Sequence, residues 1–68
     1  MNYYEYEVFH TKEGVDSVSA VLRTRSYNKA KELAYDISGV VMENIYEYSD
    51  REMVDDFTNE EEEDEPAQ

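Results

Sequence analysis

The sequence predicts an α+β fold with a ββαβ order of elements over residues 1–57, followed by a disordered acidic tail over residues 58–68. Three observations support this prediction: two β-rich runs are separated by turn residues, an amphipathic helical pattern follows them, and residues 60–65 are all acidic. At 68 residues the chain can bury one small core, and it has no cysteine for a disulfide or a thiolate metal site. We therefore expect a three-stranded antiparallel sheet in the order 2-1-3 with one helix packed on one face.

The first two expected strands form a hairpin. Residues 3–10 are rich in aromatic and β-branched side chains, and residues 15–24 alternate apolar and polar side chains. The Thr-Lys-Glu-Gly segment between them is typical of a turn. A register that keeps the apolar members of both strands on one face leaves residues 11–15 as the loop. The expected pairs are Val8 with Val18, Tyr6 with Ala20, and Tyr4 with Leu22.

The helix is expected over residues 27–38. Ser26 precedes it as a polar N-cap, and Gly39 follows it at the position where a left-handed C-cap is expected. Apolar residues recur at helical spacing, with charged residues on the other faces. This apolar stripe consists of Ala30, Leu33, Ala34 and Ile37.

A third strand is expected over residues 40–48, and a short helix after it. The strand offers two sets of alternating side chains, and we expect the set beginning at Val40 to face the helix, although Asn44 then needs a hydrogen-bond partner. Ser49 and Glu52 match a capping box, which predicts a short C-terminal helix. The inward set is Val40, Met42, Asn44, Tyr46 and Tyr48; the outward set is Val41, Glu43, Ile45 and Glu47.

The handedness of the connection gives the order of the strands. A right-handed crossover through the helix makes the third strand parallel to the second, with the first strand between them and antiparallel to both. The helix then covers one face of the sheet. We expect the other face to be open.

The acidic composition limits the partners of this protein. The formal net charge is −12, and residues 60–65 supply six of the 18 acidic residues. Six adjacent like charges without apolar surface predict a disordered tail. Because this charge repels phosphate backbones and anionic lipids, we expect basic protein partners and no direct binding to nucleic acid or membrane. The lack of a long apolar run or a signal-like first segment indicates a soluble cytoplasmic protein.

The sheet face away from the helix is the candidate site. On the expected register it carries carboxylates from two neighbouring strands, with tyrosines near its edges that can stack on arginine side chains. Carboxylates spaced about 6.8 Å along a strand and about 4.8 Å between strands approach the layout of nucleic-acid phosphates. An ordinary solvated sheet face is the alternative interpretation. The candidate partner-binding residues are Tyr3, Glu5, Glu7, Glu43, Glu47 and Tyr48, extended by Asp50, Glu52, Asp55 and Asp56.

Catalytic and cofactor chemistry have little support in the sequence. His10 is the only histidine, and although it is expected near Asp16, no nucleophile with a second orienting group accompanies it. The acidic residues of segment 50–56 lack the glycine and the spacing of an EF-hand loop. We therefore expect no enzyme activity, no metal and no cofactor.

Residues 26–48, together with the preceding hairpin, resemble a group of small proteins that act on RNA polymerase. The polar N-cap Ser26, the Ala30-x-x-Leu33-Ala34 helix core and the following strand are similar to the short phage-encoded ββαβ inhibitor of bacterial RNA polymerase. They are also similar to the epsilon subunit of Firmicute RNA polymerase, which shares that fold. The chain departs from the inhibitor in its long acidic tail. The resemblance implies a compact acidic protein that binds a nucleic-acid-handling machine, and no individual functional residue carries over.

These observations predict a non-enzymatic, DNA-mimic-like acidic protein, encoded by a phage, that occludes the nucleic-acid-binding surface of a basic host protein and inhibits it. The candidate targets are RNA polymerase, a nuclease, a DNA-packaging protein or a repair protein. Two alternatives stay open. One is a small accessory subunit of a polymerase, and the other is a structural homo-oligomer, such as a homodimer, joined through the sheet face or the edge strand 15–24.

Overall fold

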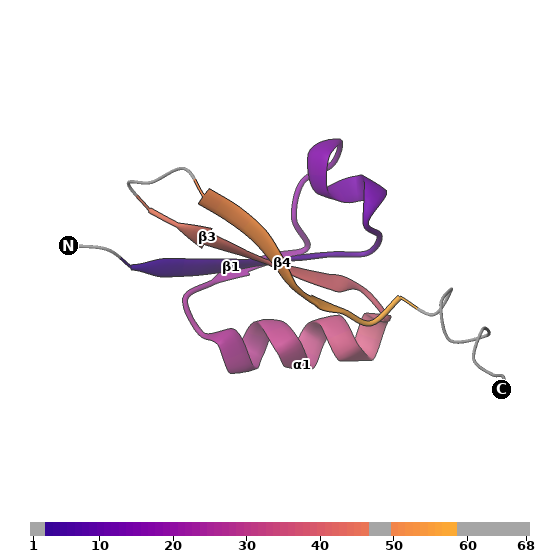
Figure 1. The fold of residues 1–68 in the computed structure, drawn as a ribbon. Coiled ribbons are helices and arrows are strands. Elements are labelled where there is room, and N and C mark those ends of the chain that lie inside the picture. The colour runs from indigo at the N-terminus through magenta and orange to yellow at the C-terminus, as the bar shows by residue number, and fades with distance from the viewer. Residues whose placement is uncertain (1–2, 47–49, 59–68) are drawn as a thin grey trace, which may run out of the picture.

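The computed structural model describes residues 3–46 and 50–58, and it is a four-stranded antiparallel sheet with one α-helix. The sheet order is β2-β1-β3-β4, so the predicted α+β class, the antiparallel pairing and the 2-1-3 order are confirmed, with one strand added at the edge. In Figure 1 the α-helix lies on one side of the sheet and the 3₁₀ segment, in purple, on the other. The elements in chain order are β1 (Tyr4–Phe9), the 3₁₀ helix η1 (Glu13–Asp16), β2 (Leu22–Thr24), α1 (Tyr27–Ile37), β3 (Val40–Ile45) and β4 (Asp50–Asp56).

The hairpin between β1 and β2 has a longer loop than expected. Val8 pairs with Leu22 rather than with Val18, which is a shift of the predicted register by four residues. The loop satisfies some of its backbone hydrogen-bonding groups locally: the N–H of Gly14 in η1 donates to Thr11 Oγ1 over 3.0 Å. Residues 15–20 were predicted to belong to the second strand because their side chains alternate, but they lie in the loop and do not pair with β1. Because the shift is even, each side chain of β2 keeps its predicted face.

Helix α1 begins as predicted and ends differently. The Ser26 hydroxyl accepts a hydrogen bond from Lys29 N over 3.3 Å, which confirms the N-cap. The left-handed residue at the C-terminus is Ser38, with φ 56° and ψ 45°, and not the predicted Gly39. Gly39 has another role, because a Cβ there would lie 2.2 Å from the Phe9 carbonyl oxygen. This close approach lets the chain enter β3 directly beside β1.

Strand β3 presents the opposite faces to those predicted. In an antiparallel pair, directly opposed residues share a face, and Val8 of β1 is opposite Val41. Val41 therefore packs under the helix, while Val40 and Met42 point to the other side of the sheet. Asn44 also points there, and its Nδ2 donates to Glu7 Oε1 over 2.9 Å, so it needs no partner under the helix.

The segment predicted as a short C-terminal helix is strand β4. It pairs with β3 along its length, with Ile45 opposite Asp50 and Val40 opposite Asp56, and with an irregularity between Val41 and Met42. The strand pairing prevails over the local capping-box pattern because a helix of one or two turns has marginal stability without tertiary contacts. The prediction of three strands is therefore wrong by one.

The sheet carries apolar clusters on both faces, so the face away from the helix is not open as predicted. Because the η1 loop folds back over β1 and β3, it covers part of that face. The first cluster lies between the sheet and α1 and contains Val8, Ala30, Ala34 and Val41, with Tyr6, Leu22, Leu33, Ile37, Val54 and Phe57 packed against it. The second lies between the sheet and the η1 loop and contains Phe9, Val15, Val40 and Met42, with Ala20 packed against it.

The folded part extends one residue beyond the predicted boundary. Thr58, assigned by sequence to the tail, is 7% exposed, and both its backbone N–H and its hydroxyl donate to Asp56. The predicted disorder of the remaining tail, residues 59–68, concerns positions outside the described residues. Within residues 3–46 and 50–58, no helix has the length and apolar character needed to cross a bilayer.

Candidate acidic interface

The carboxylates expected on one face are divided between the two faces of the sheet. Glu5 and Glu7 lie on the face away from α1. Glu43 is opposite Tyr6 and points to the helix side, where Tyr6 donates to it. Glu47 and Tyr48 lie outside the described residues. The predicted site is therefore not brought together as one surface.

Glu5 and Glu7 are held by cations of the same chain. Arg23 lies 3.5 Å from Glu5 and 3.4 Å from Glu7, and Arg51 lies 3.4 Å from Glu7. The two carboxylate side chains are only 19% and 13% exposed. The true hairpin register brings Arg23 directly opposite Glu7, whereas the predicted register placed it beyond Glu5. These two carboxylates therefore contribute little charge to a partner.

Tyr3 and Tyr46 are engaged within the chain. Their rings meet edge to face with centroids 4.5 Å apart, and the Arg25 guanidinium lies 4.0 Å from the centroid of the Tyr3 ring. The Tyr46 hydroxyl donates to Glu5 over 2.9 Å. Tyr46 was expected under the helix and instead lies with Tyr3. Tyr3 is 38% exposed and already binds an arginine, so it is not an unoccupied anchor.

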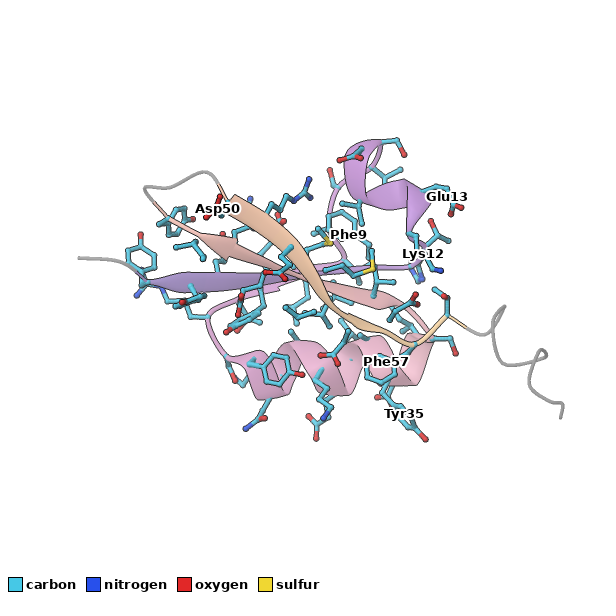
Figure 2. All side chains as sticks on the ribbon, in the orientation of Figure 1. Phe9, Lys12, Glu13, Tyr35, Asp50 and Phe57 are labelled. Atoms are coloured by element: carbon cyan, nitrogen blue, oxygen red, sulfur yellow. The ribbon has the colours of Figure 1, made fainter. Side chains whose placement is uncertain are left out.

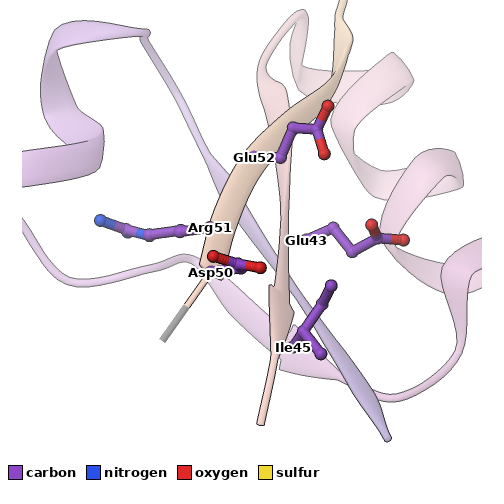
Figure 3. Close-up of a pocket in the computed structure, with 5 residues that line it drawn as sticks. All are labelled: Glu43, Ile45, Asp50, Arg51 and Glu52. Carbon is purple, nitrogen blue, oxygen red and sulfur yellow. The ribbon is translucent and has the colours of Figure 1, made fainter. Parts of the chain in front are cut away.

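A different acidic surface lies on the helix side of β3 and β4. We define the acidic edge as Glu43, Asp50, Glu52 and Asp55. Glu43 is directly opposite Glu52, and Asp50 follows on the same face of β4. Figure 3 shows the Glu43 and Glu52 side chains extending to one side of the strands and Arg51 to the other. A cavity of about 220 Å³ here is lined by Glu43, Ile45, Asp50, Arg51 and Glu52.

The acidic edge has no compensating cation among the described residues. The ion pairs of the described chain involve other carboxylates: Lys12 lies 3.1 Å from Asp56, Arg23 pairs with Glu5 and Glu7, and Arg51 pairs with Glu7 and Asp16. Like charges directly opposite each other on neighbouring strands destabilise a sheet. The Glu43–Glu52 pair therefore costs stability that no ion pair among the described residues offsets.

Two tyrosines orient carboxylates of the acidic edge. Tyr6 donates to Glu43 over 3.1 Å, Tyr27 donates to Asp55, and the two rings lie 5.4 Å apart. Burial and the bond to Glu43 raise the pKa of Tyr6, whereas the bond to Asp55 and then burial raise the pKa of Tyr27. Both hydroxyls therefore stay protonated donors at neutral pH, and they orient the carboxylates of Glu43 and Asp55.

Asp56 belongs to the other side of β4. Burial alone would raise its pKa, but the hydrogen bonds from Thr58 and the nearby Lys12 ammonium outweigh burial and lower it. Its charge is used within the fold. Of the predicted residues, the acidic edge thus retains Glu43, Asp50, Glu52 and Asp55.

Sequence reasoning missed the tyrosines that support this edge, Tyr6 and Tyr27. Tyr6 was predicted as a core residue, and nothing local indicates that its hydroxyl reaches Glu43, which is 37 positions away. Asp16, which was expected near His10, pairs with Arg51 over 3.3 Å. No group of described residues has the arrangement of a metal site.

No protein-family model, no curated protein and no solved structure matches this chain.

Proposed function

We propose that this protein is a non-enzymatic acidic binding protein that occupies the basic nucleic-acid-binding surface of another protein, as a DNA mimic does. One observation carries the proposal: among the described residues, the acidic edge keeps four carboxylates without a cation, while the carboxylates on the opposite face are paired. A surface that bears a cost in sheet stability and has no cation of its own among the described residues fits a cationic partner outside the chain.

The spacing of the acidic edge supports this choice of partner. Directly opposed residues on neighbouring strands are about 4.8 Å apart and alternate residues along a strand about 6.8 Å apart. Successive phosphates along one DNA strand are separated by about 3.4 Å of helical rise. The carboxylates of the acidic edge are therefore spaced more widely than these phosphates but on a similar scale. Because the whole chain carries a net charge of −12, its field also attracts a basic groove before contact.

The resemblance to phage-encoded inhibitors of RNA polymerase gives the biological setting of the proposal. A target of this class is a cytoplasmic nucleic-acid-binding protein of a bacterial host, with RNA polymerase as the first candidate. Nucleases, DNA-packaging proteins and repair proteins present the same basic grooves. Occupying such a groove inhibits the target because duplex and mimic cannot bind together.

The test is capture of host proteins by the immobilised full chain from a nuclease-treated bacterial lysate at low salt, followed by elution with excess duplex DNA. We expect nucleic-acid-binding proteins to be captured and then released by the duplex. A captured polymerase that duplex DNA fails to displace would instead support an accessory subunit and overturn the mimic.

A pair of charge-reversal variants locates the site. Asp50→Lys/Glu52→Lys changes the acidic edge, and Glu13→Lys/Asp36→Lys changes two exposed carboxylates elsewhere. Both variants have a net charge of −8, since each substitution adds two charges to −12. We expect the first variant to lose duplex-releasable capture and the control to retain most of it. Equal loss in both would mean that net charge alone drives binding and that the acidic edge is not the site.

A further inference from the structure

A second surface lies beside the acidic edge and runs along α1, from Asn28 in its first turn to Tyr35 near its end. We define the aromatic groove as the hollow of about 600 Å³ lined by Asn28, Lys31, Glu32, Tyr35 and Phe57. Figure 2 shows Tyr35 and Phe57 next to each other below the end of β4. Their rings meet edge to face, with centroids 5.6 Å apart and an angle of 90° between the planes.

The two aromatic residues differ in how firmly they are held. Phe57 packs against the cluster under the helix, and its backbone N–H donates to the Gly39 carbonyl over 2.7 Å. Tyr35 is 70% exposed, although its neighbour Ala34 is buried. The groove therefore has one fixed wall and one large aromatic surface open to solvent. Such a pair of an anchored and an exposed aromatic residue is typical of interface hot spots.

The net charge of the chain, −12, and the neighbouring acidic edge favour a cationic occupant, although the lining of the groove has one acidic and one basic residue. Glu32 lies one helical turn before Tyr35 and lines the same hollow. The only cation lining the groove, Lys31, has its ammonium 5.9 Å from the Tyr27 ring, towards the N-terminal half of α1. With Asp55 of the acidic edge two residues before Phe57, this aromatic hollow suits a side chain that is both flat and positive.

The molecule contains an example of the same contact. The Arg25 guanidinium lies 4.0 Å from the centroid of the partly exposed Tyr3 ring. Guanidinium groups stack on aromatic faces better than ammonium groups do, because they are planar and weakly hydrated. The same chemistry is available at the face of Tyr35.

The geometry points to the aromatic groove as the binding site for an arginine side chain of the basic partner, with the guanidinium stacked on Tyr35 against the wall formed by Phe57. This inference rests on the proposed function, since it names a contact made by that partner. It also extends the acidic edge, because Asp55 precedes Phe57 by two residues on the same strand end. A partner bound along β4 reaches carboxylates first and the aromatic pair next.

The experiment uses nonaarginine and nonalysine peptides as probes of the full chain, with affinities measured by calorimetry at low salt. Tyr35→Ala is expected to weaken nonaarginine binding about two- to five-fold and to change nonalysine binding less. Tyr35→Phe keeps the ring and should retain wild-type affinity for both peptides. Tyr4→Ala removes another exposed tyrosine, outside the groove, and should leave both affinities unchanged.

The outcomes separate this inference from the proposed function. Unchanged nonaarginine binding by Tyr35→Ala, or an equal loss for both peptides, would overturn the arginine site and leave the acidic edge standing. If neither peptide binds the wild-type chain at low salt, the proposal of a basic partner fails as well. Circular dichroism of each variant verifies that the exposed positions were changed without loss of the fold.

Discussion

Tyrosine hydroxyls at three positions hold carboxylates of distant segments. Tyr6 donates to Glu43, Tyr27 to Asp55 and Tyr46 to Glu5. A hydrogen bond to an ionised acceptor is stronger than one between neutral groups. In a chain with this excess of acid, these bonds give Glu43 and Asp55 a donor where no cation among the described residues pairs with them, and they give Glu5 a donor in addition to Arg23.

Replacing Tyr27 with phenylalanine should lower the free energy of unfolding by about 1 kcal/mol at neutral pH, because Asp55 loses a donor. The pKa of Tyr27 is raised in the folded state, so its contribution is complete below its unfolded pKa, about 10, and is lost as the pH rises through the folded value. Stability of the wild type should therefore fall above about pH 10, and less steeply in Tyr27→Phe.

Urea unfolding between neutral and alkaline pH measures both effects. Tyr35→Phe is the control, because Tyr35 is 70% exposed and its ring contact with Phe57 survives the change. A Tyr27→Phe variant as stable as this control would show that the bond to Asp55 contributes nothing.

The two residues that follow α1, Ser38 and Gly39, give a second prediction: substitutions at these adjacent positions should change the free energy of unfolding in opposite directions. Ser38 adopts φ 56°, which costs a residue with a Cβ about 1 kcal/mol, so Ser38→Gly should stabilise the fold by about 0.5–1 kcal/mol. Gly39→Ala should destabilise it by about 2–3 kcal/mol, because the new Cβ meets the backbone of Phe9. Thermal unfolding of the two variants gives the comparison. If Gly39→Ala proves as stable as the wild type, the close approach of the chain to β1 is not as described.

At the level of elements, Arg51 of β4 binds the η1 loop to the sheet through an ion pair and a hydrogen bond. Its guanidinium lies 3.3 Å from Asp16 and donates to the Val15 carbonyl over 3.1 Å. It also lies 5.7 Å from the centroid of the Phe9 ring. One side chain therefore connects the last strand, the loop and the second apolar cluster.

Arg51→Met should destabilise the fold by about 1–2 kcal/mol, because it removes hydrogen bonds to a partly buried carboxylate and to a backbone carbonyl. Hydrogen exchange of the loop amides should accelerate most. The matched control is Arg23→Met, whose side chain is 60% exposed and whose pairs contribute less than about 1 kcal/mol. Equal losses in both variants would contradict a special role for Arg51.

The helix and the order of the first three strands could be predicted because their signals are local or follow from handedness. Ser26 caps the helix as expected, and the crossover gives the 2-1-3 order. The hairpin register could not be predicted, since residues 15–20 alternate in the same way whether they pair or form a loop. Val15 and Ala20 of this segment pack in a cluster that the sequence pattern does not indicate, whereas Val18 is exposed.

The predictions of which side chains of β3 face the helix, and of a helix in place of β4, were wrong for a related reason. Both sets of alternating side chains in β3 contain apolar residues, and both are buried at the start of the strand because the sheet is covered on two sides. The pairing of β4 with β3 is a long-range contact that overrides a local capping signal at Ser49 and Glu52. The predicted acidic face depended on both points, so only its β3 and β4 members on the helix side remain together.

At the level of the whole molecule, the two sheet edges disfavour growth by strand addition. β2 has only three residues, and four of the seven residues of β4 are acidic. Short or charged edge strands are the usual means of preventing pairing with another sheet. This argues against a homo-oligomer joined through the strand edges.

Charge repulsion across the whole chain should make stability increase with salt. With a net charge of −12, screening lowers self-repulsion more than it weakens the few internal ion pairs. The urea midpoint should therefore rise between about 0.02 M and about 0.3 M NaCl. Asp50→Lys/Glu52→Lys, with less charge to screen, should show a smaller rise. A midpoint that falls with salt would mean that the internal pairs dominate.

The order β2-β1-β3-β4 separates the charges of the sheet as well as its strands. Residues 17–31, which include β2, contain four basic residues and no acidic residue, whereas the acidic edge lies on β3 and β4. The molecule therefore has an electric dipole directed across the sheet. The field of the basic partner that we propose would exert a torque on this dipole and turn β4 towards the partner before the surfaces meet. If the proposed function holds, the sheet order contributes to the rate of association as well as to the fold, because it turns random encounters into oriented ones.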